Sequence, residues 1–299
     1  MFYNLLLLVF GVFCCATSVI FIKLSQIQPI TLSSFRLLTA TVFLMPIFFK
    51  EYRVYREKIS LKDFLTPVWP AVILSFHFIS WIAAARLTSA ANASLIVNLV
   101  PLVMPLLLYV FLKEKIDKTE TIATLIALAG VSLLGFSDFS ANPEFLKGDI
   151  LSFISMLFLS IYLVLGRKNS DQVSLWLYIV PLYFFAFCFC FVVALIFETP
   201  LRCYEARDII IAIGLGLVPT VIGHTVLNYA MRHLRGQVVS IFSMFQFVFA
   251  GVMSYYLFNE VPTKTFYFVS LLLTISGILV TIGATGLSSF LRKKSQPFK

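Results

Sequence analysis

The chain has 299 residues, of which 60% are hydrophobic and 12% are charged, and its formal net charge is +9. So little polar surface cannot cover the two soluble domains that this length would suggest, which excludes an ordinary water-soluble protein. The charged residues cluster between continuous apolar runs of about 20 residues, the length at which a helix crosses roughly 30 Å of hydrocarbon. Because the runs do not alternate apolar and polar residues, the sequence predicts an all-α membrane protein and not a β-barrel.

Ten apolar runs follow one another along the chain, and we interpret each as a transmembrane helix. They cover approximately residues 3–22, 30–50, 68–86, 92–112, 119–136, 148–166, 174–197, 208–231, 238–258 and 264–287. Most of the 23 Lys and Arg residues fall in loops on the side of the N-terminus. The positive-inside rule therefore predicts a multi-pass membrane protein with both termini in the cytoplasm.

An internal repeat divides these spans into two halves. The pattern of residues 86–114 recurs at 232–260. When the two stretches are aligned, identical residues coincide: Arg86, Ser94, Tyr109 and Glu114 with Arg232, Ser240, Tyr255 and Glu260. Five spans per half is an odd number, so the second half would enter the membrane from the other side, as an inverted-topology repeat requires. The expected organisation is a first repeat at 1–136, a linker at 137–147, a second repeat at 148–287 and a basic tail at 288–299.

The charged residues and cysteines limit the chemistry. The acidic residues lie in loops or at span ends, so no carboxylate is expected at mid-membrane to serve as a proton relay. The five cysteines show no CxxC spacing, and we expect neither a metal site nor a cofactor. The basic residues lie mostly beside spans, which topology explains without a nucleic-acid partner.

Histidines and an aromatic residue mark the equivalent spans three and eight. His77 lies near the middle of span three, with Trp81 one helical turn away on roughly the same face. In span eight, Thr220, His224 and Asn228 recur every fourth residue and would share one helix face. A polar stripe must face protein or water, so these residues either line a cavity or join helices by hydrogen bonds.

Other spans carry further polar candidates. Span four contains Asn98 close to Pro101, whose ring can kink the helix; span six contains Tyr162 and span nine contains Gln246. Stripes on several spans could meet at one axis, and we predict substrate contacts for His77, Trp81, Asn98, Tyr162, His224, Asn228 and Gln246.

Two cations lie toward the outer side of the first half. Lys23 ends span one, and Arg36 lies about six residues into span two, too deep for an ordinary loop charge. Each either snorkels to the interface or contacts a carboxylate or phosphate of the substrate.

The order and spacing of several stretches resemble the drug/metabolite transporter superfamily, specifically EamA-type proteins. The match is carried by ARLTSAANASLIVNLVPLVMPLLLYVFLKE at 85–114, GDILSFISMLFLSIYLVLGRK at 148–168, LGLVPTVIGHTVLNYAMRHL at 215–234 and VSIFSMFQFVFAGVMSYYLFNE at 239–260. The resemblance implies ten helices, an inverted repeat, and movement of small metabolites across the inner (plasma) membrane. It also implies a cavity formed mainly by spans one, three, four, six, eight and nine.

Two features of the resemblance concern single residues. Many members have Glu-Pro where this chain has Gln246 and Phe247, a departure that removes a buried carboxylate and a kink. Glu114 and Glu260 match acidic span ends of the family, which we interpret as structural, capping the next helix.

The leading hypothesis is a secondary transporter that moves a small amphipathic metabolite, such as an amino acid or related compound, out of the cell by alternating access. An importer of phosphorylated sugars or nucleotide-like anions, with Lys23 and Arg36 as anion contacts, is one alternative. A non-transporting membrane assembly partner is another. An enzyme is not expected, because GxSxG, HExxH and a mid-span acidic pair do not occur. The partners expected are a small molecule and the lipid bilayer, and the sequence does not specify an oligomeric state.

Overall fold

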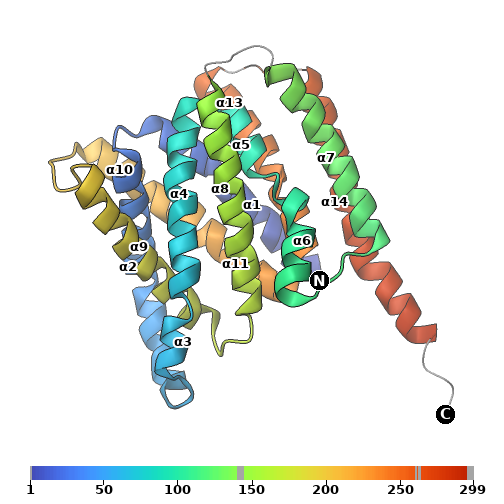
Figure 1. Cartoon of the computed structure of the whole chain (residues 1–299), viewed down its shortest axis with the longest axis horizontal. Helices are drawn as coiled ribbons and strands as arrows, with labels where there is room; N and C mark the ends of the chain where they lie inside the picture. Colours follow the sequence, from blue (N-terminus) through green and yellow to red (C-terminus); the bar gives the residue numbers. More distant parts are fainter. Residues whose placement is uncertain (1, 140–144, 260, 262–263, 295–299) are drawn as a thin grey trace.

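A computed structural model describes residues 2–139, 145–259, 261 and 264–294, and within these residues the chain is helical, without a strand (Figure 1). The first half contains α1 Phe2–Leu24, α2 Pro29–Tyr55, η1 Arg56–Lys58, α3 Leu61–Leu65, α4 Val68–Leu87, α5 Ala90–Val97, α6 Val100–Leu112 and α7 Lys118–Phe139. The second half contains α8 Leu146–Lys168, α9 Leu175–Phe197, α10 Ala206–Leu215, η3 Gly216–His224, α11 Thr225–His233, α12 Gly236–Ser243, α13 Phe245–Phe258 and α14 Lys264–Lys294.

Nine helical segments in the described part of the chain are long and apolar enough to cross a membrane, and they coincide with nine of the ten expected spans. The expected span 119–136 is occupied by α7, a helix of 22 residues that is not among the nine. Ten spans therefore remain a prediction. Residues 140–144 of the expected linker, Glu260 and residues 295–299 of the tail lie outside the described residues, and α14 continues beyond the expected span end at 287.

Spans four and nine are both interrupted, at equivalent places in the repeat. In span four, α5 ends at Val97 and α6 begins at Val100. Pro101 lies in the first turn of α6, where backbone N–H groups have no partner within the helix, so its lack of an N–H costs no helical hydrogen bond. In span nine, α12 ends at Ser243 and α13 begins at Phe245. Span nine is therefore interrupted at Met244 although Phe247 stands in the place of a proline, and the expected loss of a kink stays a prediction.

Span eight changes its winding midway. Between α10 and α11, residues Gly216–His224 form the wider π-helix, which includes Pro219. Thr220 Oγ1 donates to the Leu215 carbonyl oxygen five residues earlier, at 3.0 Å. π-Helical turns inside α-helices are frequent at functional sites.

The helices pair across the two halves. Neighbouring pairs are α2 with α9, α4 with α8, α7 with α14, and α1 with both η3 and α13. Asn4 at the start of α1 lines a pocket with His233, and Arg167 at the end of α8 donates to the Met231 carbonyl oxygen beside it. The start of α1 thus lies where α8 ends, so these two helices run in opposite directions (Figure 1).

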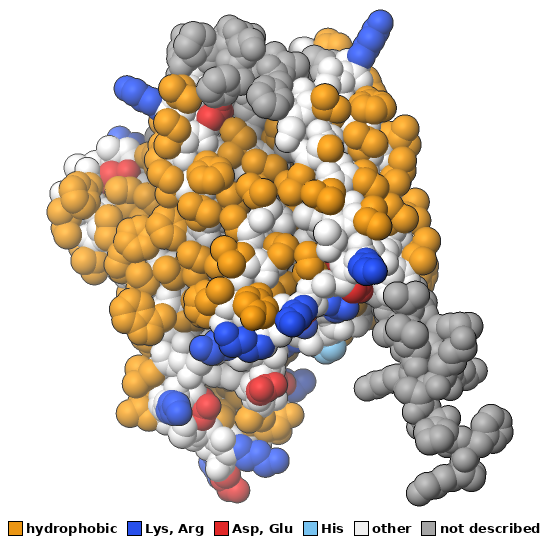
Figure 2. Space-filling model, turned by 45° about the vertical axis from the view of Figure 1, so that its right-hand side comes forward, with side chains coloured by type: hydrophobic (Ala, Val, Ile, Leu, Met, Phe, Trp, Pro, Cys, Tyr) orange, Lys and Arg blue, Asp and Glu red, His pale blue; other side chains and the backbone are white. Residues whose placement is uncertain are grey.

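A broad apolar band covers the face of the molecule shown in Figure 2, and the Lys and Arg side chains gather mainly at its lower end. Large apolar side chains are exposed on the molecule, among them Leu106 at 63% and Tyr256 at 77%. Such a surface is stable in lipid and not in water. The protein is therefore a multi-pass membrane protein.

Candidate functional site

A small central cavity lies where both halves contribute polar side chains. Its volume is about 20 Å³, which is enough for about one water molecule. The lining comes from helices of both halves: Cys15, Ser18, Arg36, His77, Trp81, Val97, Leu159, His224, Leu227 and Gln246.

Arg36 of α2 is the single Lys, Arg, Asp or Glu residue among those that line the cavity, and its side chain does not reach the interface. The residue is 1% exposed, and no carboxylate of the described residues lies within 4.0 Å of its guanidinium. Its Nε donates to Thr220 Oγ1 at 2.6 Å, and its Cζ lies 3.8 Å from the centre of the Phe78 ring. Burying an uncompensated charge is costly, so a cation held this way indicates function. The snorkelling interpretation of Arg36 is wrong.

Ser18 of α1 links this cation to the aromatic wall of the cavity. Its Oγ accepts from Arg36 Nη1 at 3.3 Å and from Trp81 Nε1 at 3.1 Å. A serine oxygen has two lone pairs and one O–H. Because both lone pairs are occupied, the O–H remains as a donor.

The two histidines face each other across the boundary between the halves. The ring centres of His77 on α4 and His224 at the end of η3 are 6.1 Å apart. His77 Nδ1 lies 2.8 Å from Ser155 Oγ and 3.1 Å from the Ser155 carbonyl oxygen. Since a carbonyl oxygen only accepts, this contact fits the tautomer with the proton on Nδ1 and leaves Nε2 as an acceptor. His224 Nδ1 is buried and has no partner in the described part of the chain.

Asn228 and Tyr162 form the next layer behind His224. Asn228 Nδ2 donates to the Tyr162 hydroxyl and, at 2.8 Å, to the His224 carbonyl oxygen. The Tyr162 ring lies 6.1 Å from that of His224. Neither residue is among those lining the cavity, so their contact with a substrate stays a prediction, whereas their contact with His224 is direct.

Asn98 and Gln246 connect the two interrupted helices at their breaks. Gln246 Nε2 donates to Asn98 Oδ1 at 2.9 Å, and Asn98 Nδ2 donates to the Ser94 carbonyl oxygen at 2.7 Å. Asn98 directly follows the end of α5, and Gln246 lies in the first turn of α13. Discontinuous helices that meet between repeats commonly form the substrate sites of transporters.

Lys23 lies apart from these residues. Its Nζ donates to the Thr88 carbonyl oxygen at 3.2 Å, in the turn after α4, and it does not line the cavity. The Thr88 hydroxyl in turn donates to Asp149 of the second half at 2.8 Å. Lys23 and Arg36 therefore do not converge on one anion in this conformation.

Ion pairs join the halves at the end that the sequence predicts to be cytoplasmic. Arg167 Nε pairs with Glu114 at 2.7 Å, and Arg235 pairs with Asp117 at 3.2 Å and with Glu120 at 2.7 Å. At the start of α7, the Glu120 backbone N–H donates to the Asp117 carboxylate at 2.8 Å, and the Asp117 backbone N–H donates to the Glu120 carboxylate at 2.9 Å. Asp117, and not Glu114, therefore caps α7. Glu114 instead forms an ion pair with Arg167 of the second half.

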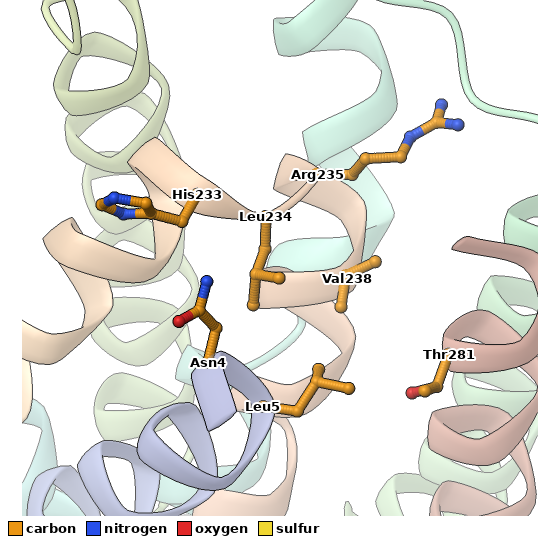
Figure 3. A pocket seen from close by; sticks show the side chains of 7 residues that line it. All are labelled: Asn4, Leu5, His233, Leu234, Arg235, Val238 and Thr281. Carbon is orange, nitrogen blue, oxygen red and sulfur yellow. The ribbon is translucent and has the colours of Figure 1, made fainter. Parts of the chain in front are cut away.

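A second pocket opens beside this cluster, with a volume of about 320 Å³. Figure 3 shows Asn4 and Leu5 of α1 facing His233 and Leu234, with Thr281 of α14 on the far side and Arg235 pointing away from them. The pocket is near the lower limit of ordinary small-molecule sites.

The cysteines form no redox or metal centre among the described residues. All five are free thiols, and no group of three His, Cys, Asp or Glu side chains is placed to hold a metal ion. Cys15 Sγ lies 3.7 Å from the Pro219 carbonyl oxygen, where α1 packs on η3.

Comparison with known proteins identifies the family. The model of the EamA-like transporter family matches residues 2–136 and 146–283, nearly the whole chain. The chain belongs to the EamA-like transporter family. It is therefore a membrane transporter, and the sequence resemblance is confirmed.

Relatives of this EamA-like chain are named as transporters. An uncharacterized transporter of Archaeoglobus fulgidus is 24% identical over 92% of this chain and 96% of its own length, and a second from the same organism is 27% identical over 64% and 67%. Solute carrier family 35 member G1 of Mus musculus is 27% identical over 85% of this chain and 72% of its own length. A crystal structure with 15% identity has a TM-score of 0.76, covering 95% of this chain and 99% of the other, which shows a shared fold.

Two residues that contact Arg36 in this EamA-like transporter were not predicted from the sequence: Ser18, which lines the cavity, and Phe78, which does not. Ser18 lies in an apolar run with no second polar residue to form a stripe, and Phe78 is one of 32 Phe residues. The guanidinium that both contact comes from α2, a span that the resemblance did not place at the cavity. A charge deep in span two was the one available signal.

Proposed function

We propose that this EamA-like protein is a secondary transporter that moves a small amphipathic metabolite, by efflux, through the central cavity by alternating access. The observation that carries the proposal is the Gln246–Asn98 bond, which joins the two interrupted helices beside His77, His224 and Arg36. The cavity combines polar donors with apolar surface, which suits an amphipathic ligand.

The size of the cavity supports a conformational step. A space of about 20 Å³ is far below the roughly 300 Å³ of ordinary ligand pockets, so helices must separate before a metabolite enters. Bonds between the halves lie at both ends of the molecule. One end has the Arg167–Glu114 pair, and the other has Glu198, which accepts from the backbone N–H groups of Ile30 and Thr31 at 3.0 and 2.7 Å. Breaking one set at a time would expose the cavity to one side at a time.

The opposite directions of α1 and α8, and the pairing of α2 with α9 and α7 with α14, support two inverted repeats related by an axis in the membrane plane. A metabolite bound between such halves would change sides when they rock against each other. An importer of phosphorylated compounds is less well supported, because Lys23 does not join Arg36 at the cavity.

Transport by reconstituted vesicles tests this assignment. The substrate is first found by comparing the metabolites released by cells with and without the protein, and its flux is then measured in vesicles. We expect Trp81→Ala and His77→Ala to lower the flux at least about tenfold at equal protein content, because each removes a wall of the site. Trp69→Ala is the matched control, since Trp69 lies on the same helix and is 75% exposed.

Unchanged flux in both cavity variants would disprove the site, whereas loss of flux in Trp69→Ala would show that the assay reports general damage. If no metabolite differs between the two cell populations and none is moved by vesicles, the transport assignment fails and the assembly-partner hypothesis returns.

A further inference from the structure

We propose that Arg36 binds a single carboxylate, and that the transported compound is a small monocarboxylate with an apolar body. This inference rests on the proposed transport function and names the substrate class of the same cavity. Three independent features carry it: the charge of the cavity, the number of its unused donors and the apolar character of the remaining wall.

The charge of the cavity is +1 and has no internal counter-ion. Arg36 is 1% exposed, and among the described residues no Asp or Glu lines the cavity or pairs with the guanidinium. The ring of Phe78 at 3.8 Å covers the face of the guanidinium but does not use its in-plane N–H groups. A bound anion would neutralise the charge of Arg36 and so supply the counter-ion that the described residues do not provide.

The donors that remain free form a site for an oxyanion. A guanidinium has five N–H donors, and the hydrogen bonds described for Arg36 use one at Nε and one at Nη1. The O–H of Ser18 is free because the Ser18 oxygen already accepts twice. His224, 6% exposed, adds an imidazole Nδ1 that has no partner within the described part of the chain. Guanidinium and hydroxyl donors that line one cavity are groups that bind a carboxylate.

A carboxylate fits better than a phosphate because the cavity supplies one cation. A phosphate monoester carries about −1.5 to −2 charges at neutral pH, which a single guanidinium cannot neutralise. The second cation that the sequence suggested, Lys23, donates to Thr88 and does not line the cavity. The rest of the wall includes Val97, Leu159 and Leu227, which would contact an apolar body.

Binding to the purified protein in detergent tests the inference. Trp69→Phe combined with Trp176→Phe leaves Trp81 as the single tryptophan, since the chain has three, and its fluorescence then reports on the cavity. The probes are matched pairs: phenylacetate and phenylacetamide, 4-methylpentanoate and 4-methylpentanamide, leucine and leucinamide, with phenyl phosphate as the competing anion. We expect at least one carboxylate to bind about tenfold or more tightly than its amide, the difference that a charge-assisted bond makes.

Variants assign the binding to Arg36. In the same background, Arg36→Gln should weaken that carboxylate about tenfold or more and leave the amide unchanged, while Arg36→Lys should retain part of the affinity. Arg53→Gln is the matched control, because it makes the same change on the same helix at an exposed position. If Arg36→Gln does not fold, Ser18→Ala decides: it keeps the charge, removes one donor and should weaken the carboxylate several-fold but not the amide.

The inference is overturned if no carboxylate binds more tightly than its amide, if phenyl phosphate binds more tightly than phenylacetate, or if the Arg36 and Ser18 variants bind as the parent does. These outcomes are separate from transport. If the protein moves a metabolite in vesicles but shows no preference for carboxylates, the proposed transport function stands and the carboxylate inference fails. If it binds carboxylates but does not move them, the transport function fails and the carboxylate site stands.

Discussion

At the scale of single residues, the polar side chains of the cavity hold one another in place across the two halves. Ser18 and Thr220 orient Arg36, Ser155 fixes the ring of His77, and Asn98 fixes the amide of Gln246. In a membrane interior each such partner also satisfies a group that water cannot reach. These residues are therefore expected to affect stability as well as transport.

Gln246→Leu tests this coupling. The substitution leaves Asn98 Oδ1, in a residue that is 2% exposed, without its donor, at a cost of about 1–3 kcal/mol. We expect a lower unfolding temperature in detergent, and a double variant with Asn98→Leu that loses less stability than the two single losses together. Gln26→Leu, at an exposed position, serves as the control. Additive losses would mean that the amides do not act as a pair.

The sequence identified most of these residues but not their arrangement. His77, Trp81, His224 and Gln246 were predictable because a polar or aromatic residue stands out in an apolar run, and all four line one cavity. The direction of Arg36 was not predictable, because it depends on Thr220, which is 184 positions away in the chain. Patterns within one span say which face is polar but not which other span that face meets.

At the scale of helices, interruptions and close packing shape the site. Pro101 indicated the break in span four, and Pro219 lies inside the π-helical segment Gly216–His224, whereas Met244 carried no comparable signal for the interruption of span nine. A proline marks where regular winding is disturbed but not which form the disturbance takes. At the α1–η3 contact, Gly223 lies directly on Cys15, where an added Cβ would be 2.5 Å from Sγ.

Gly223→Ala tests whether this close contact matters. The methyl group would push α1 away from η3, since at 3.0 Å it also meets the Cys15 backbone nitrogen. Overpacking of this kind costs about 1–3 kcal/mol. We expect a lower unfolding temperature and reduced transport. Gly277→Ala should have a smaller effect, because its Cβ would meet only side chains, the nearest being that of Phe245 at 3.2 Å, whose ring needs to shift by a few tenths of an ångström. Equal behaviour of the two variants would show that the α1–η3 contact is not tight.

At the scale of the whole molecule, the proposed transport requires two oppositely inserted halves that expose one cavity to each side of the membrane in turn. The bonds of Arg167 and of Glu198 join the halves at the two ends. Removing one set should bias the molecule toward the state open at that end, because a conformational equilibrium shifts by the free energy lost from one state.

The most direct measurement of this claim uses Cys15, a thiol that lines the cavity. With the four other cysteines replaced by serine, a membrane-impermeant thiol reagent is added to one side or the other of oriented vesicles. Cys14, also on α1 and 3% exposed but not lining the cavity, is the matched single-cysteine control. Cysteines introduced at Lys147 and Lys168 identify the sides and should themselves react from opposite ones.

We predict that Cys15 reacts from both sides, that Cys14 reacts from neither, and that Arg167→Ala increases the reaction of Cys15 from the side that labels the cysteine at position 168. Reaction of Cys15 from a single side, unchanged by Arg167→Ala, would contradict alternating access at this cavity.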